Sequence, residues 1–398
     1  MTAKIYLKKG REASILRFHP WVFSGAVANV VGNPSEGDLV GVYSSTGEIL
    51  AMGHWQVGSI VVRILSFAGD PSSPVFWTDA LRAAYELRVG VGLVNSRNTN
   101  CYRLVHGEGD GLPGLIIDYY DGVIVMQAHS AGMFRAKKQI CEALQSLYGK
   151  KLKAVYDKSS GTAPFKAGLE LIDGYLYKAP DFTDEPVIVS ENGHKFKIDW
   201  REGQKTGFFL DQRDNRALVE SYSKGRRVLN LFSYTGGFSV YALAGGALRA
   251  DSVDSSSKAI SIASENLELN GFSSDRHEEY CADVKDFLAT VEPGKYDLII
   301  VDPPAFAKHR GAVSQALRAY QRLNAAAIEA VAHGGLVFSF SCSHVVDRQA
   351  FLEAVFSASA QTGRRVRILD RLNQPSDHAV NIYHPEGEYL KGLLLYVE

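Results

Sequence analysis

Residues 228–242 read VLNLFSYTGGFSVYA, and this stretch decides the fold. An apolar run is followed by the pair Gly236 and Gly237, and then by a segment with helical periodicity. Glycine lets the backbone turn tightly and approach a ligand closely. The next expected strand ends at Asp254, 17 residues after Gly237, close to the roughly 20 residues at which nucleotide-binding folds place an acid on ribose hydroxyls. Together the two features favour a nucleoside-bearing cofactor over an ordinary strand-to-helix turn.

The same alternation of strand and helix continues from about residue 186 to the end of the chain. Apolar runs that end in small or acidic residues are separated by segments of helical periodicity. This pattern predicts an α/β fold with right-handed βαβ units and a doubly wound, mostly parallel sheet. Ligands of such a sheet bind at the carboxyl ends of its strands. The expected strands are RRVLNLFSY, ALRADSVDSS, a weaker HEEYCAD, KYDLIIVDPP, GGLVFSFSCS, RVRILDRL and GLLLYVE.

Two further domains are expected before this sheet. Strand-like runs alternate with turn signals up to Asp70, which predicts a small β-barrel. A helical segment, two strands around a Gly- and Asp-rich turn, and a helix with the sequence MFRAKKQICEALQSLYG then predict a central α+β domain. The predicted boundaries are 1–72 for the barrel, 73–185 for the central domain and 186–398 for the doubly wound domain.

The composition indicates a globular protein of the cytoplasm. Of the 398 residues, 46% are hydrophobic and 22% are charged, which is enough apolar material to bury cores. No apolar run approaches the roughly 18 to 20 residues of a membrane-spanning helix, and the first residues lack a signal peptide's apolar core. The four cysteines are far apart without a CxxC pair. We therefore expect reduced thiols, no metal site and no membrane partner.

The charge is balanced overall but not locally. A net charge of -1 gives no global sign of nucleic-acid binding. Before Glu36 five basic residues face a single acid, Glu12, and between Asp302 and Glu329 four basic residues occur without an acid. Such runs are more often solvated faces than binding sites, and they gain weight only if chemistry nearby requires a polyanion. The residues are Lys4, Lys8, Lys9, Arg11 and Arg17 in the first run, and Lys308, Arg310, Arg318 and Arg322 in the second.

Two later strands also end in acids. Asp283 follows the HEEYC strand, where it could accept from an adenine amino group or cap the helix VKDFLATV. Asp302 is followed by Pro303 and Pro304, which stiffen the chain and fix the position of the acid at the strand exit. With Phe306 close behind, this favours a site that holds a flat base between an acid and an aromatic ring. The alternative is a loop that is simply stopped by its prolines.

Cys342 stands at the end of the fifth strand, LVFSFS, between Ser341 and Ser343. The fourth and fifth strands of this fold are neighbours, so we expect Asp302 and Cys342 to emerge side by side. A thiol is intrinsically very nucleophilic, although only a few per cent is thiolate at neutral pH. We interpret Cys342 as a nucleophile. For the other three cysteines we keep the reading of buried, structural side chains; they are Cys101, Cys141 and Cys281.

The chain resembles a known family along nearly its whole length. It is similar to the class I, Rossmann-like, S-adenosylmethionine-dependent RNA methyltransferases, specifically the bacterial large-subunit ribosomal RNA cytosine-5 methyltransferase I family. The stretch GQKTGFFLDQR is highly specific for this resemblance, whereas the glycine turn is not. Further matching stretches are LKKGREASILRFHPWVFSGAV of a PUA domain, YRLVHGEGDGLPGLIIDYYDG of the central domain, and VLNLFSYTGGFSVYA, VDSS, DPPAF, YQRLN and FSCS in the expected order.

The resemblance implies S-adenosylmethionine as the cofactor and ribosomal RNA as the partner. It implies Cys342 as the nucleophile and Asp302 as a catalytic acid that also borders the cofactor. If the target base is turned out of its stack, Phe306 is a candidate stacking platform, and the basic stretch from Lys308 through Arg310 to Arg322 lies beside the entrance as a contact of the RNA. The implied cofactor contacts are Phe232, Ser233, Tyr234 and Gly236 on the methionine part, Asp254 with Ser255 on the ribose, Asp283 on the adenine, and Gln204, Thr206 and Phe208 closing over the site.

The implied reaction is consistent with these residue types. Addition of a thiolate at carbon 6 of cytosine makes carbon 5 nucleophilic enough to take a methyl group. A protonated Asp302 would stabilise the charge that develops at ring nitrogen 3. Other RNA cytosine-5 methyltransferases carry a second cysteine in the proline motif, but this chain has Ala305 and Phe306 there. Release of the product must then use another base.

Three other functions remain open from the sequence. A methyltransferase acting on a guanine nitrogen shares the GQKTGFFLDQR and acid–proline motifs but needs no thiol. A non-catalytic RNA-binding protein would have no use for Asp254, Asp302 and Cys342 together. A nicotinamide-dependent oxidoreductase is disfavoured by DPPAF and by the missing GxGxxG. For the oligomeric state, a homodimer is one option.

Overall fold

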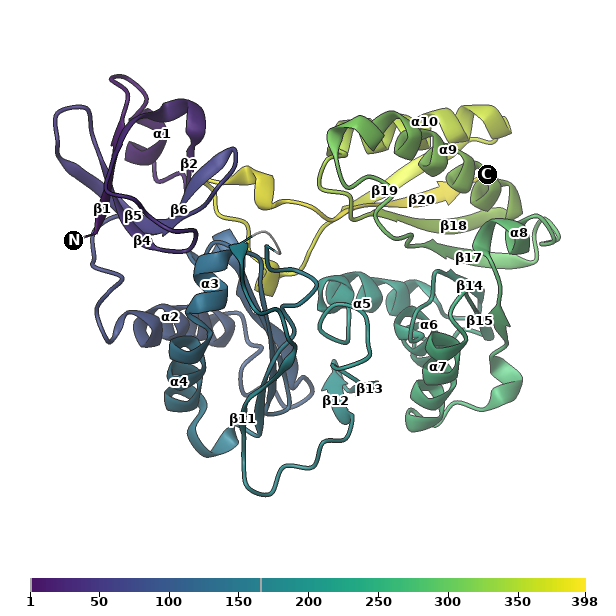
Figure 1. Cartoon of the computed structure of the whole chain (residues 1–398). Helices are drawn as coiled ribbons and strands as arrows, with labels where there is room; N and C mark the ends of the chain where they lie inside the picture. Colours follow the sequence, from purple (N-terminus) through teal and green to yellow (C-terminus); the bar gives the residue numbers. More distant parts are fainter. Residues whose placement is uncertain (1, 165–166) are drawn as a thin grey trace. The chain divides into compact units, whose positions relative to one another are not determined.

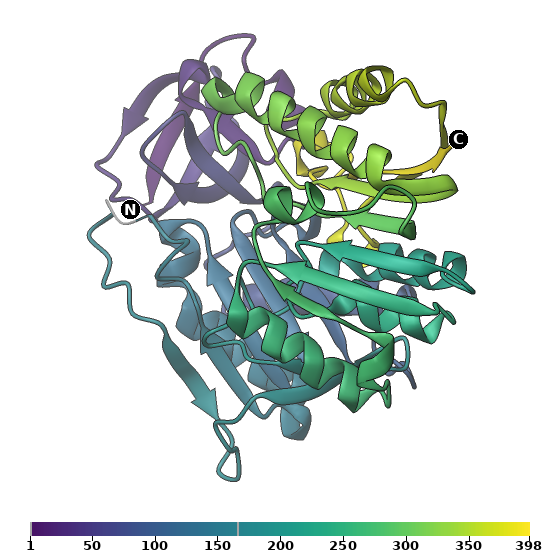
Figure 2. The same cartoon turned by 90° about the vertical axis from the view of Figure 1, so that its right-hand side faces the viewer.

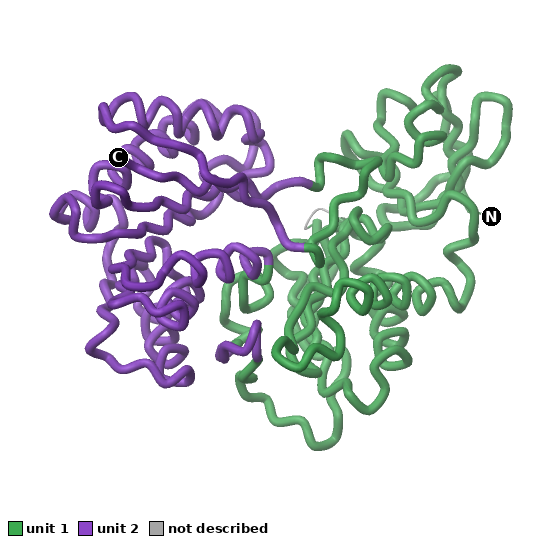
Figure 3. Tube along the Cα trace, turned by 180° about the vertical axis from the view of Figure 1, so that it is seen from behind, with its two compact units in different colours: residues 1–189, 198–210, 376–387 green, residues 190–197, 211–375, 388–398 purple. Residues whose placement is uncertain are grey.

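The chain forms two compact units in the computed structural model, which describes residues 2–164 and 167–398. Unit 1 comprises Met1–Val189, Ile198–Leu210 and Ser376–Gly387. Unit 2 comprises Ser190–Lys197, Asp211–Pro375 and Glu388–Glu398 (Figure 3). Residues 165 and 166 of the predicted central domain lie outside the described part. Within that part, no helix has the length and apolar character needed to cross a membrane.

The first part of unit 1 is a six-stranded sheet with the order β2-β6-β5-β4-β1-β3. All pairs are antiparallel except β1 with β4. Alternate residues such as Ile5, Val42 and Val62 form its core. The β-rich expectation for this region is confirmed. The elements are β1 (Ala3–Leu7), α1 (Ala13–Leu16), β2 (Trp21–Phe23), β3 (Val27–Val31), β4 (Leu39–Tyr43), β5 (Ile49–Trp55) and β6 (Ile60–Ser66).

The second part of unit 1 is a five-stranded sheet with the order β11-β10-β9-β8-β7. Helices α2, α3 and α4 lie along one side of it (Figure 1), and Leu81, Leu115 and Leu144 belong to the shared core. The predicted helix MFRAKKQICEALQSLYG is divided at Ala136, whose ψ of -2° separates α3 from α4. The elements are α2 (Phe76–Gly90), β7 (Cys101–His106), β8 (Leu115–Tyr120), β9 (Val123–Ala128), α3 (Ala131–Arg135), α4 (Lys137–Tyr148), β10 (Ala154–Asp157) and β11 (Gly174–Lys178).

Unit 2 contains a seven-stranded sheet with the order β16-β15-β14-β17-β18-β20-β19. The first five strands are parallel, and β20 runs antiparallel to both β18 and β19. Helices α5, α6 and α7 lie on one side of the sheet and α9 and α10 on the other (Figures 1 and 2). The predicted doubly wound, mostly parallel sheet is therefore confirmed. Its strands are β14 (Arg227–Leu231), β15 (Arg249–Asp254), β16 (Glu279–Cys281), β17 (Tyr296–Val301), β18 (Val331–Ser341), β19 (Val366–Leu372) and β20 (Lys391–Val397).

The helices of unit 2 connect these strands in turn. They are α5 (Arg213–Tyr222), α6 (Gly237–Ala244), α7 (Ser257–Leu269), α8 (Val284–Leu288), α9 (Val313–Ala330) and α10 (Arg348–Thr362). A hairpin that the sequence reading did not anticipate, β12 (Val187–Glu191) with β13 (His194–Ile198), precedes α5.

A buried ion pair involves the stretch DNR (214–216), which directly follows the motif GQKTGFFLDQR. The Arg216 guanidinium donates from Nε to the Glu191 carboxylate over 2.8 Å, and the Tyr241 hydroxyl donates to the same carboxylate over 2.9 Å. Glu191 is fully buried. Buried charges are tolerated when they are paired and hydrogen-bonded. These contacts therefore join α5 and α6 to the end of β12.

The boundaries of the three domains predicted from the sequence stay a prediction.

Candidate active site

The turn after β14 has an unusual backbone. Phe232 and Tyr234 have φ of 58° and 46°, and Gly236 has φ of 76°. Positive φ is rare for large residues, and such conformations gather at ligand sites where the surroundings impose them. Gly236 must be a glycine for a second reason, because a Cβ atom there would lie 2.9 Å from the Cβ of Ala263 on α7. Small residues thus let α6 begin close against α7 at the carboxyl end of β14.

Asp254 holds this turn from the end of the neighbouring strand β15. Its Oδ2 accepts from the Tyr234 backbone N–H over 2.9 Å, and its Oδ1 accepts from the Ser256 N–H over 2.9 Å. A carboxylate has about four lone-pair sites, so each oxygen can accept a further hydrogen bond. Ser233, in the same turn, has a buried hydroxyl that makes no hydrogen bond to the described residues. The carboxyl ends of β14 and β15 therefore offer both a charged group, on Asp254, and a neutral polar group, on Ser233.

Asp283 caps α8 at the end of β16. Its Oδ1 accepts from the backbone N–H groups of Lys285 over 2.9 Å and of Asp286 over 3.3 Å. The helix-capping alternative for Asp283 is thus confirmed. Asp283 also lines a cavity of about 740 Å³ together with Phe232 and Phe306. Its predicted contact with adenine stays a prediction, since one residue can cap a helix and border a ligand site.

Cys342 and the loop that begins with Asp302, Pro303 and Pro304 lie at the carboxyl ends of neighbouring strands. Strands β17 and β18 are parallel neighbours, with Val301 opposite Ser339. Asp302 directly follows β17, Cys342 directly follows β18, and the Cys342 sulfur lies 3.9 Å from the Pro303 carbonyl oxygen. The prediction that the two strand ends lie side by side is confirmed. Both side chains are half-buried.

A polar network surrounds the Cys342 backbone, and the sequence reading missed it. The Ser341 hydroxyl donates to the Tyr320 hydroxyl over 2.9 Å, and the Tyr320 and Ser343 hydroxyls are hydrogen-bonded over 3.1 Å. The buried Lys391 ammonium donates to the Ser343 carbonyl over 2.7 Å. Burial lowers the pKa of Lys391 to about 8, and the nearby Cys342 thiol opposes this shift. The sequence offered one signal for Lys391, because it is the charged first residue of the otherwise apolar strand β20.

The remaining predicted residues of unit 2 differ in how far their side chains are buried. The Phe306 ring packs 4.8 Å from the Tyr320 ring, while Ser255, Lys308 and Arg310 are exposed. Cys101 and Cys141 are buried as expected, but Cys281 is exposed. The expectation for Cys281 was wrong because β16 is the short edge strand of the sheet.

Gln204, Thr206 and Phe208 belong to unit 1. The Thr206 hydroxyl donates to the Asp118 carboxylate over 2.6 Å and is hydrogen-bonded to the Tyr120 hydroxyl over 3.0 Å. Phe208 is 4% exposed. These contacts attach the segment Ile198–Leu210 to the five-stranded sheet. The predicted contacts of the three side chains with a cofactor stay a prediction.

Comparisons with known proteins decide the family. A family model described as S-adenosylmethionine-dependent methyltransferase matches residues 103–394, and one described as a PUA-like domain matches residues 5–67. The chain is 42% identical to ribosomal RNA large subunit methyltransferase I of Aeromonas hydrophila, over 99% of both chains. The chain is 38% identical to the Escherichia coli protein of that name, over 98% of both. The chain belongs to the ribosomal RNA large subunit methyltransferase I family.

Membership of the methyltransferase I family makes S-adenosylmethionine the cofactor of this protein. The crystal structure of SMU.776 complexed with SAH aligns over 100% of both chains with a TM-score of 0.85 and 25% identity. The residues present fit such a cofactor. Its ribose hydroxyls need a carboxylate at the end of the second strand, where Asp254 stands, and its polar methionine end suits the buried Ser233 hydroxyl. The six-stranded sheet is the PUA-like domain of the family.

Proposed function

We propose that this protein transfers a methyl group from S-adenosylmethionine to carbon 5 of a cytosine in large-subunit ribosomal RNA, through a covalent bond to Cys342. The observation that carries the proposal is the position of the Cys342 thiol. It lies 3.9 Å from the Pro303 carbonyl oxygen, at the carboxyl ends of the strands β17 and β18. A methyltransferase acting on an amine or ring nitrogen needs no thiol at this place. The relatives named above, whose printed names specify ribosomal RNA, support the substrate class.

The residues at the carboxyl ends of β14, β15 and β16 would hold the cofactor. Phe232, Ser233, Tyr234 and Gly236 would surround its methionine part, and Asp254 with Ser255 would accept from its ribose hydroxyls. Asp283 would accept from the adenine amino group at the cavity that Phe232 and Phe306 also line. When bound, S-adenosylmethionine supplies an electrophilic methyl group on a positively charged sulfur.

The thiol of Cys342 would make the cytosine reactive. Its thiolate forms a bond to carbon 6, and the electrons of the 5,6 double bond then become available at carbon 5 for the methyl group. Lys391 would favour the thiolate, because a nearby positive charge lowers the pKa of a thiol. Removal of the carbon-5 proton and cleavage of the sulfur–carbon bond restore the aromatic ring.

Asp302 would stabilise the ring during the addition. A protonated carboxyl group can donate a hydrogen bond to ring nitrogen 3, where negative charge develops. The two prolines that follow hold the carboxyl group at the strand exit. A half-buried position beside a polar network suits an acid that must share a proton.

The RNA must present an unstacked cytosine to this site. Unstacking costs a few kcal/mol and is cheapest in a loop or bulge. Phe306, packed against Tyr320, would offer a ring face to the base. The exposed Lys308 and Arg310 would contact phosphates, and the PUA-like domain would supply a second RNA contact.

The test is the chemical identity of the methylated nucleoside. Total RNA from a strain lacking the gene is incubated with the protein and S-adenosylmethionine carrying a labelled methyl group, and the nucleosides are then separated. We expect label in 5-methylcytidine for the wild type, none for Cys342→Ala, and normal labelling for Cys281→Ala, which also removes an accessible thiol. RNA with 5-fluorocytosine should trap the wild type covalently. Label in a methylated guanosine from Cys342→Ala would overturn the proposal in favour of guanine nitrogen methylation.

A further inference from the structure

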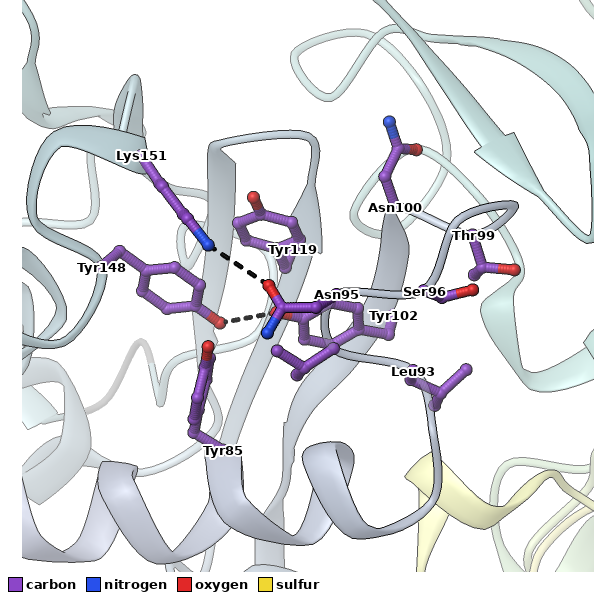
Figure 4. A pocket seen from close by; sticks show the side chains of 11 residues that line it. Tyr85, Leu93, Asn95, Ser96, Thr99, Asn100, Tyr102, Tyr119, Tyr148 and Lys151 are labelled. Atoms are coloured by element: carbon purple, nitrogen blue, oxygen red, sulfur yellow. Dashed lines mark hydrogen bonds between the residues drawn. The ribbon is translucent and has the colours of Figure 1, made fainter.

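A second pocket lies in unit 1, in the central sheet and its helices. Four tyrosine side chains form it, from α2, β7, β8 and the end of α4, and a loop after α2 closes one side (Figure 4). Its volume is about 160 Å³, well below the roughly 300 Å³ at which sites for drug-sized ligands begin. The space suits one flat ring rather than a whole nucleotide. The four tyrosines are Tyr85, Tyr102, Tyr119 and Tyr148.

The tyrosines are arranged as a stack with one ring edge-on. Tyr119 lies parallel to Tyr102 at 4.9 Å and to Tyr148 at 5.0 Å, measured between ring centroids. Tyr85 meets Tyr148 edge-on at 5.6 Å. The hydroxyls of Tyr102 and Tyr148 are hydrogen-bonded over 3.0 Å. Burial raises the pKa of Tyr119 to about 12, so this hydroxyl stays neutral. The result is an aromatic wall with polar tips and no negative charge.

The opposite side of the pocket is polar and basic. The Lys151 ammonium donates to the Asn95 amide oxygen over 3.2 Å, and Figure 4 shows both side chains converging in front of the tyrosine rings. Asn95 has φ of 58°, which an asparagine tolerates better than most residues. Lys150 and Lys151 are exposed next to the pocket, and no acid occurs between Gly149 and Lys153. An incoming polyanion would therefore meet positive charge at the rim.

We infer that this tyrosine pocket binds an unpaired nucleobase of the RNA, apart from the cytosine that is methylated. Unstacked bases are recognised by aromatic faces together with amide and hydroxyl groups at the base edge. Tyr102 and Tyr148 are buried in the stack. The half-buried Tyr85 and Tyr119 therefore provide the aromatic surface for the base, and Asn95 provides the amide. Lys151 supplies a charge for the adjoining phosphate. This inference rests on RNA as the substrate class, which is proposed above.

The test uses the full chain and a fluorescein-labelled single-stranded RNA 12-mer, with a 12-base-pair RNA duplex as the comparison. We expect Tyr85→Ala to weaken single-strand binding by about 5- to 160-fold, the range of stacking on one aromatic ring. Asn95→Gly should weaken it by about 2- to 13-fold, the range for loss of one hydrogen bond, and neither variant should have much effect on the duplex. Glycine is compatible with the backbone at position 95. Tyr85→Phe, which keeps the ring, should bind within about 2-fold of the wild type.

Charge controls separate the pocket from general electrostatics. Lys151→Met should weaken single-strand binding, whereas Lys138→Met should not. Lys138 is an exposed residue of α4, ten positions before Tyr148 and hence about 15 Å away along the helix. All variants should match the wild type in far-ultraviolet circular dichroism and in thermal unfolding, which shows that the unit carrying the pocket is folded.

Two results would overturn the inference. One is wild-type affinity for the single strand in both Tyr85→Ala and Asn95→Gly, and the other is an equal loss for single strand and duplex. Failure of the proposed reaction would look different, since it concerns the methylated product and Cys342. A 12-mer carrying 4-thiouridine should also cross-link under ultraviolet light to peptides that line the pocket, and cross-linking only elsewhere would count against it.

Discussion

Single residues at the proposed cofactor site have more than one role. Asp254 accepts hydrogen bonds from two backbone N–H groups, and it is also the residue that we propose to contact the ribose. The hydrogen bond from Tyr234 fixes a residue at positive φ, so the carboxylate shapes the turn as well as the ligand site. Charge-assisted hydrogen bonds of this kind are stronger than neutral ones. Substitutions at Asp254 should therefore act on binding through two routes that can be separated.

We expect Asp254→Ala to weaken S-adenosylmethionine binding by roughly 1.5 to 3 kcal/mol, because it removes a charged hydrogen-bond acceptor. Asp254→Asn should lose less, since one amide oxygen can still accept from the turn. Isothermal titration calorimetry of the full chain measures both values, and circular dichroism checks the fold. Unchanged affinity in a folded Asp254→Ala protein would show that the ribose lies elsewhere.

The buried Lys391 should make the free energy of unfolding depend on pH. Its pKa is about 8 in the folded chain and about 10.4 when unfolded, so the unfolded state binds more protons between these values. Stability contributed by this site therefore rises with pH from about 8 to about 10.4. Lys391→Met removes the contribution. Urea unfolding at pH 7.5 and pH 10 should show a stability gain for the wild type that is smaller in the variant, and equal gains would contradict the buried ammonium.

At the scale of elements, the contact between α6 and α7 depends on one missing methyl group. We expect Gly236→Ala to destabilise the protein by about 1 to 3 kcal/mol, because alanine at φ of 76° is strained and its Cβ would meet that of Ala263. Adding Ala263→Gly should recover only the part due to the clash. Thermal unfolding of both variants measures this. Full recovery in the double variant would show that the backbone at position 236 is not strained.

The sequence predicted individual helices and strands better than it predicted which elements, far apart in the sequence, lie next to each other. The pairing of β17 with β18 follows from the tendency of strands that are consecutive in the chain to lie next to each other, so Asp302 and Cys342 were expected together. The insertion of β20 between β18 and β19 has no local signal, so Lys391 was missed beside Cys342. Cys281 was misjudged for a similar reason, since its exposure depends on β16 being the sheet edge.

At the scale of the molecule, the PUA-like domain packs closely on the central sheet within unit 1. A methyl group on Gly132 of α3 would overlap the ring of His54 on β5. Trp21 and Arg63 each donate to the Glu108 carboxylate over 2.8 Å. Deleting residues 1–70 would therefore uncover buried surface of the central part. Substitution of exposed charges is the better way to test the role of the PUA-like domain in RNA binding.

The last prediction concerns the salt dependence of RNA binding by the full chain. Lys9 and Arg11 are exposed in the PUA-like domain, whereas Lys8 is bound to the Gly25 carbonyl. Each phosphate contact on a single strand contributes about 0.7 to the slope of log affinity against log salt. Lys9→Gln combined with Arg11→Gln should therefore reduce the slope by about 1.4. Lys224→Gln with Lys295→Gln removes equal charge just before β14 and β17, at the strand ends away from the candidate site, and should leave the slope unchanged. Equal slopes for wild type and both double variants would exclude Lys9 and Arg11 from the RNA contact.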